Sequence, residues 1–235
     1  MVGTPTFKAV LFSDSLDSIL DAIKSLIGKP YGCFEQTSAT TYPMVMALQL
    51  LKEIKAQFQL RGDDEMIVKI EAMEKEITKN LQEGYTKLIS FETSTKGYEW
   101  FGSTPGHEAL TSYGLGQFFE MKQVVDFVDD AAIQRNSDWL LARRKQDGSG
   151  QFDMNPRQLD TFGGASQDIT DAYIVWILSA LDGFDYYNIG DELRNIKVIA
   201  LKTNDPYLLA LCSGALWNVG RVDAAKQIAS RLSSF

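Results

Sequence analysis

The chain has 235 residues, a length that fits one domain built around a single large core. Its 31 acidic and 23 basic residues give a formal net charge of −8, so we expect neither nucleic acid nor anionic lipid as a partner. No apolar run reaches the roughly 20 residues that span a bilayer, so we expect no membrane insertion by this domain. The start Met1-Val2-Gly3 resembles an expression start joined to a piece of a longer protein.

Cysteine usage narrows the chemistry further. Cys33 and Cys212 are too few for a disulfide-stapled scaffold or a structural zinc site, although they could pair with each other. We expect neither a metal nor a cofactor. Cys212 lies in the apolar run 208–212 and reads as a small buried hydrophobe, whereas Cys33 lies among turn residues.

Apolar periodicity predicts helices throughout the chain and no convincing strand. Glycine, proline, serine and aspartate cluster between the apolar segments, as is typical of turns and helix starts. The nine predicted helices span residues 15–28, 38–60, 64–92, 107–123, 128–145, 168–182, 190–202, 206–219 and 221–233.

Helices of two kinds alternate after the first one. Those beginning near Ser38, His107, Asp168 and Pro206 are apolar on most faces, which predicts burial, and the intervening ones have one charged face. This order predicts an all-α fold of the α/α-toroid type, in which inner helices form a ring and outer helices run back. Four hairpins and one leading helix fall short of the six hairpins that close such a ring, so either the last helices are missing or the barrel is open. A solenoid of stacked hairpins is the alternative, and the lack of a fixed repeat length disfavours it.

Two loops look weakly alike and support the ring. Residues 98–102 (Tyr-Glu-Trp-Phe-Gly) and 146–152 (Gln-Asp-Gly-Ser-Gly-Gln-Phe) each place glycine next to aromatic residues just ahead of an apolar helix.

The segment Gly32-Cys33-Phe34-Glu35-Gln36 carries the clearest chemical signal. A cysteine sulfur can replace the ammonia of a glutamine amide only where the two side chains meet, and the i, i+3 spacing of Cys33 and Gln36 allows this in a turn or first helical turn. Gly32 gives the backbone freedom for a tight approach. The plainer interpretations are that Cys33 is a small buried side chain or an ordinary thiol, and that Glu35 only complements a helix N-terminus.

This segment resembles the Gly-Cys-x-Glu-Gln thioester motif of the alpha-2-macroglobulin and complement family. Pro43 early in the next helix, the run 139–141 (Trp-Leu-Leu) and the helix start 110–113 (Leu-Thr-Ser-Tyr) extend the likeness to nearly the whole chain, and Phe34 is typical of the bacterial branch. The resemblance implies that residues 1–235 are one thioester-containing domain of a larger multidomain protein. It also implies an exported parent, located in the periplasm, outside the cell or on the cell envelope.

In complement-type members a histidine takes the acyl group first and directs it to hydroxyls. The matching stretch here, from Asp153 to Gln167, contains no histidine, which puts that mechanism in doubt. His107, the single histidine of the sequence, begins an inner helix, and parallel inner helices have their N-termini at one end of the barrel. His107 is therefore a candidate catalytic residue. The alternative is that its ring packs on Trp100 or Phe101.

Aromatic residues gather near the same end of the predicted barrel. In the family, aromatic side chains shield the resting thioester from water. Packing of loops onto the barrel rim would explain these residues equally well. The candidate shielding residues are Tyr31, Phe34, Tyr42, Tyr98, Trp100 and Phe101.

The function implied by the resemblance is covalent trapping, most simply of an attacking protease, in the manner of an endopeptidase inhibitor that acts once rather than an enzyme. Opsonin-like tagging of a surface would use the same chemistry with another nucleophile. Two further classes stay open: a glycosidase with paired carboxylates among Asp153, Asp160, Asp168 and Asp205, and a non-covalent binding module with an inert motif.

Overall fold

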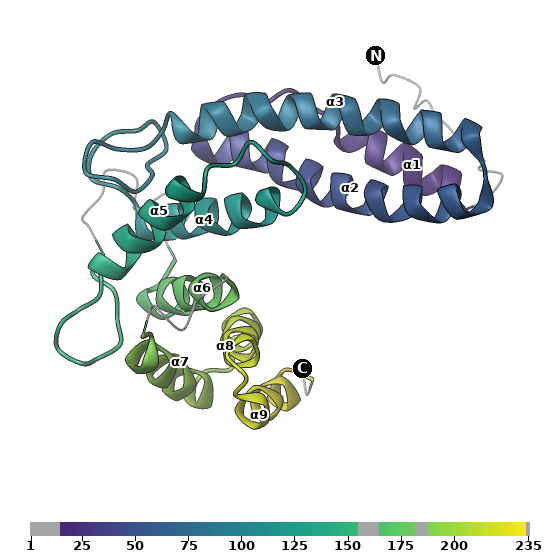
Figure 1. Ribbon diagram of the computed structural model, residues 1–235. Helices are drawn as coiled ribbons and strands as arrows, with labels where there is room; N and C mark the ends of the chain where they lie inside the picture. The colour runs from purple at the N-terminus through teal and green to yellow at the C-terminus, as the bar shows by residue number, and fades with distance from the viewer. Residues whose placement is uncertain (1–14, 155–164, 182–187, 234–235) are drawn as a thin grey trace, which may run out of the picture.

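The structure is a computed structural model that describes residues 15–154, 165–181 and 188–233 (Figure 1). Within these residues it is all-helical, and its only β-pairing is two isolated bridges. No helix in the described part of the chain combines the length and the apolarity needed to cross a bilayer. The helices are α1 (Ser15–Leu26), α2 (Phe34–Arg61), α3 (Asp64–Ile89), α4 (Glu108–Lys122), α5 (Asp130–Ala142), α6 (Gln167–Ala180), α7 (Gly190–Lys202), α8 (Pro206–Asn218) and α9 (Val222–Leu232).

The nine predicted helices are confirmed, with one informative difference at the start of α2. The sequence predicts this helix from about residue 38, but it begins at Phe34, so the motif itself forms the first turn. Cys33 is the N-cap residue with extended backbone angles, φ −78° and ψ −176°. The first turn is capped by Cys33, a residue type outside the usual N-cap set, together with Gln36 at the third helical position.

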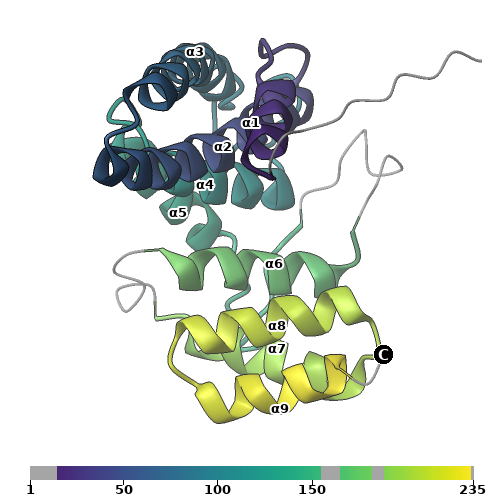
Figure 2. The same ribbon diagram turned by 90° about the vertical axis from the view of Figure 1, so that its right-hand side faces the viewer.

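The helices are arranged as an arc of hairpins. The pairs α2–α3, α4–α5, α6–α7 and α8–α9 pack as neighbours, and the inner helices pack in the series α2, α4, α6, α8. The long α2–α3 hairpin crosses Figure 1 from side to side, whereas α6 to α9 are seen lengthwise in Figure 2. The direction of the helices therefore turns along the arc. Helix α1 packs on α2, at the opposite side of the arc from α9.

Helix α4 joins the two halves of the core. Its residue Phe118 belongs to the cluster formed with α2 and α3, and its residue Leu115 belongs to the cluster formed with α6 to α9. A Cβ on Gly114 would lie 2.6 Å from the Phe34 ring, and a Cβ on Gly116 would lie 2.7 Å from Ile177 Cδ1. Glycine at these positions lets both neighbouring inner helices approach α4 closely.

The two similar loops in the sequence are built alike. Each contains an isolated antiparallel bridge, Glu92–Tyr98 in one and Arg144–Phe152 in the other, and the aromatic residue of each bridge is completely buried. In both, a side chain from the first turns of the following inner helix accepts a hydrogen bond from the aromatic residue's N–H. The acceptor is Thr111 for Tyr98 (2.8 Å) and Asp171 for Phe152 (3.0 Å).

Candidate functional site

In the first turn of α2, the side chains of Cys33 and Gln36 each accept a hydrogen bond from the backbone of the other residue. The Cys33 N–H donates a hydrogen bond to Gln36 Oε1 at 3.1 Å. In return, the Cys33 side chain accepts from the backbone N–H of Gln36, which completes a reciprocal capping box. The sulfur and the carboxamide are thereby held on the same side of one helical turn, which the sequence spacing predicts.

Gly32 makes room for the Gln36 carboxamide. Its φ of +74° lies in the left-handed region that only glycine adopts freely. A Cβ at this position would lie 1.9 Å from Gln36 Oε1 and 2.7 Å from its Cδ. The folded-back glutamine therefore requires glycine at residue 32 for two separate reasons, backbone conformation and space.

Phe34 anchors the turn in the core, and its neighbours face solvent. The Phe34 side chain is fully buried, with ring centroids 5.0 Å from Tyr98 and 6.3 Å from Phe91. Cys33 is half-buried, and Glu35 and Gln36 are exposed. The glutamine of the motif therefore lies on the surface of the described chain, and Phe34 alone among these residues belongs to the core.

The loop between α3 and α4 contacts the turn through Trp100. The Trp100 carbonyl accepts a hydrogen bond from the Phe34 N–H at 2.9 Å, and the indole Nε1–H donates to Glu35 Oε2 at 3.0 Å. Sixty-five residues separate Trp100 from Glu35, and nothing in the sequence pattern links them. The sequence alone therefore does not predict this connection.

His107 lies behind Trp100, where the packing alternative places it. The two rings meet edge to face, with centroids 4.6 Å apart. His107 is also the N-cap of α4, because its Nδ1 accepts from the Leu110 N–H at 3.2 Å. A neutral imidazole that accepts at Nδ1 carries its proton on Nε2, so in this tautomer, assigned from the hydrogen bond, no ring lone pair is left for acyl transfer.

The other candidate shielding residues are spread over different surroundings. Tyr98 is fully buried and packs on Phe34, so it supports the turn from within the core rather than covering it. Tyr42 follows Cys33 by nine residues, roughly 13 Å along the helix, and packs on Tyr113. Tyr31 and Phe101 are 62% and 70% exposed. Trp100 is the aromatic residue that contacts the exposed side of the motif.

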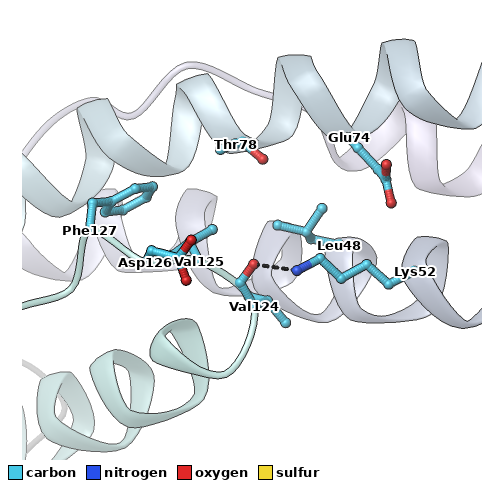
Figure 3. A pocket seen from close by; sticks show the side chains of 8 residues that line it. All are labelled: Leu48, Lys52, Glu74, Thr78, Val124, Val125, Asp126 and Phe127. Atoms are coloured by element: carbon cyan, nitrogen blue, oxygen red, sulfur yellow. Dashed lines mark hydrogen bonds between the residues drawn. The ribbon is translucent and has the colours of Figure 1, made fainter.

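A hollow in the surface lies far from the motif (Figure 3). It is formed by α2, α3 and the segment after α4, and Lys52 Nζ donates there to the Val124 carbonyl at 2.7 Å. Lys52 follows Cys33 by 19 residues, roughly 28 Å along α2, so this pocket takes no part in the chemistry of the motif.

The remaining expectations concern a possible Cys33–Cys212 disulfide, the aspartates and a metal site. Cys33 and Cys212 are not joined to each other. Asp205 caps α8 by accepting from Tyr207 and Leu208, which accounts for it structurally. Asp160 and most of the stretch 153–167 lie outside the described residues. Among the side chains that the structure describes, His, Cys, Asp and Glu gather nowhere in groups of three or more that could hold a metal ion.

The family model of the A-macroglobulin TED domain matches residues 8–228. An alpha-2-macroglobulin of Thermotoga maritima is 29% identical over 147 residues, covering 62% of this chain and 8% of that protein. Thioester-containing protein 1 of Anopheles gambiae is 26% identical over 152 residues, covering 64% and 10%.

Structural similarity points to the same fold. The native conformation of E. coli alpha-2-macroglobulin superposes with a TM-score of 0.61 at 21% sequence identity, covering 92% of this chain and 12% of that one. The chain thus spans about a tenth of the length of these relatives. It belongs to the thioester-domain family of the alpha-2-macroglobulins and resembles the bacterial members.

Proposed function

We propose that Cys33 and Gln36 form an internal thioester. The Cys33 sulfur attacks Gln36 Cδ, the Cδ–Nε2 bond breaks, and ammonia leaves with the thiol proton. The observation that carries this proposal is the Gln36 side chain folded back over Gly32, with its Oε1 held by the Cys33 N–H while the Cys33 side chain accepts from the Gln36 N–H. Such pre-positioning converts a slow encounter into an intramolecular step.

The thioester would then acylate an incoming amine. The amine nitrogen attacks Gln36 Cδ, the Cys33 thiolate leaves, and an amide bond joins the domain to its target. A thiolate leaves more readily than an amide nitrogen, so the thioester stores reactivity until a nucleophile arrives. The product amide is stable, and each domain acts once.

Amines are the expected nucleophiles. Transfer to hydroxyls requires a base or acyl carrier, and the His107 ring is engaged at Nδ1 with the N-terminus of α4. Lysine side chains of a protein target fit this requirement. We infer that the parent protein traps an attacking protease in this way, in the periplasm, outside the cell or on the envelope.

Intact mass spectrometry tests the proposal. Freshly purified protein, Cys33→Ala and Cys212→Ala are weighed with and without methylamine, and thiols are titrated in parallel. The expected result is a species lighter by one ammonia that gains methylamine and one thiol, in wild type and Cys212→Ala but not in Cys33→Ala. A preference for methylamine over glycerol supports protein trapping, and the reverse supports surface tagging.

Hydrolysis during purification is recognised by peptide mapping. A thioester lost to water leaves glutamate at position 36 in the wild type, whereas Cys33→Ala keeps glutamine there. Intact glutamine and a free Cys33 thiol in the wild type at all times would refute the covalent mechanism and favour an inert binding module.

A further inference from the structure

Trp100 makes two hydrogen bonds to residues 33–36, the reactive turn. Its backbone carbonyl accepts from the Phe34 N–H, and its indole N–H donates to the Glu35 carboxylate. Phe34 and Glu35 are the two residues between Cys33 and Gln36. We infer that Trp100 is a positioning residue that holds Cys33 and Gln36 in reacting geometry, an inference that rests on the proposed thioester.

The loop that presents Trp100 is itself fixed. Glu99 Oε2 accepts from the N–H groups of Phe101 (2.8 Å) and Ser103 (3.0 Å), which closes the chain around the tryptophan. On the other side, Gly97 and Gly106 lie against the Trp139 ring so closely that a Cβ on either would come within 2.6 to 2.9 Å of it. Trp100 is therefore a rigid support rather than a side chain that happens to touch the turn.

The hydrogen bonds from Trp100 matter because the first turn of a helix is held by few hydrogen bonds of its own. The first N–H groups of a helix have no partner within the helix, and the first turn opens easily. Thioester formation needs the sulfur and the amide carbon at near-attack distance, and small misplacements reduce such rates strongly. Fixing Phe34 and Glu35 from outside restricts the turn that joins Cys33 to Gln36, so it opens less often to water.

The same geometry assigns a function to His107. Its ring packs edge-on against Trp100, and its backbone N–H donates to the Tyr98 carbonyl at 2.7 Å. His107 thus backs the tryptophan and caps α4 at the same time. It acts on the thioester through Trp100 and is also a positioning residue, not a catalytic one.

The test measures the thioester in five variants, of which Glu35→Gln and Trp217→Phe are the controls. Trp100→Phe keeps an aromatic ring against His107 but removes the indole donor, and Glu35→Ala removes the acceptor from the exposed side, where folding is not at risk. Glu35→Gln retains a neutral acceptor. Trp217→Phe, on α8 and 57% exposed, is the control for loss of a tryptophan.

Thioester occupancy in fresh protein and its half-life in buffer are followed by intact mass. We expect Trp100→Phe and Glu35→Ala to shorten the half-life about five- to tenfold, the effect of one hydrogen bond of ordinary strength at an exposed position. Glu35→Gln should keep most of the wild-type half-life, and the half-life of Trp217→Phe should equal that of the wild type. His107→Asn keeps a capping side chain but loses the ring, so it shortens the half-life while the methylamine-to-glycerol ratio stays unchanged.

The outcomes separate the two proposals. A wild type that never loses ammonia and never acquires glutamate at position 36 overturns the thioester and the positioning role together. A wild type that carries the thioester, with equal occupancy and half-life in Trp100→Phe and Glu35→Ala, overturns the positioning role alone. A changed methylamine-to-glycerol ratio in His107→Asn overturns its assignment as a positioning residue.

Discussion

Replacing Gly32 by alanine tests the geometry of the site most directly. The residue has φ +74°, and left-handed backbone costs an L-residue roughly 1–2 kcal/mol. The added Cβ would also lie 1.9 Å from Gln36 Oε1, so the glutamine must swing away and lose its hydrogen bond from the Cys33 N–H, a further loss of about 0.5–1.5 kcal/mol. We expect a total destabilisation of about 1.5–3.5 kcal/mol and no thioester.

Gly62→Ala is the matched control. Gly62 ends α2 with φ +70°, and a Cβ there would meet nothing within 4 Å. This variant experiences the backbone cost alone, about 1–2 kcal/mol, and keeps the reactive turn intact. The difference between the two variants isolates the collision with Gln36.

Urea denaturation gives the stability of each variant, and intact mass gives its thioester content. Gly62→Ala should lose stability but keep the wild-type thioester. A Gly32→Ala protein that forms the thioester to the wild-type extent would show that the folded-back glutamine is not the reacting arrangement.

Three further changes have defined outcomes. Gly114→Ala places a methyl group 2.6 Å from Cζ of the Phe34 ring. The free energy of unfolding, measured by urea denaturation, should fall by about 1–3 kcal/mol. An unchanged denaturation midpoint would mean that α2 and α4 can move apart at no cost. Burial raises the pKa of Asp171 from 3.8 to about 6, so the folded chain favours the protonated acid, and stability is lost as the pH rises through 6. Asp171→Asn should therefore gain up to about 3 kcal/mol on the wild type between pH 4 and pH 7, and a constant difference over that range would contradict the assignment. Burial also raises the pKa of Cys212 to about 12, so at pH 8 a thiol reagent should modify the same number of native thiols in Cys212→Ala as in the wild type, and one fewer in the variant would show that Cys212 is accessible.

The helices could be predicted from the sequence because their signal is local. Apolar period marks each one, and the alternation of buried and charged-face helices follows from their positions inside or outside the arc. The start of α2 was predicted four residues late because Ser38 resembles a normal N-cap residue. The actual cap is Cys33, supported by Gln36, so the misplaced helix start coincides with the residues proposed to react.

The supports of the site could not be predicted in the same way. Cys33 and Gln36 are three residues apart, and their meeting follows from helix geometry. The contact between Trp100 and Glu35 depends on how a 16-residue loop, 91–106, folds back on a helix 65 residues away. Tyr98 stands two residues from Trp100, yet it is buried, and only the loop conformation decides which of the two faces the turn.

The anchors of the two similar loops, 98–102 and 146–152, differ in their response to pH. The first is anchored to α4 by the hydroxyl of Thr111, which does not ionise, and the second is anchored to α6 by Asp171, whose pKa is raised by burial to about 6. Acidification from pH 7 to pH 5 therefore protonates the anchor in the α6 half of the arc and leaves the anchor beside the reactive turn unchanged.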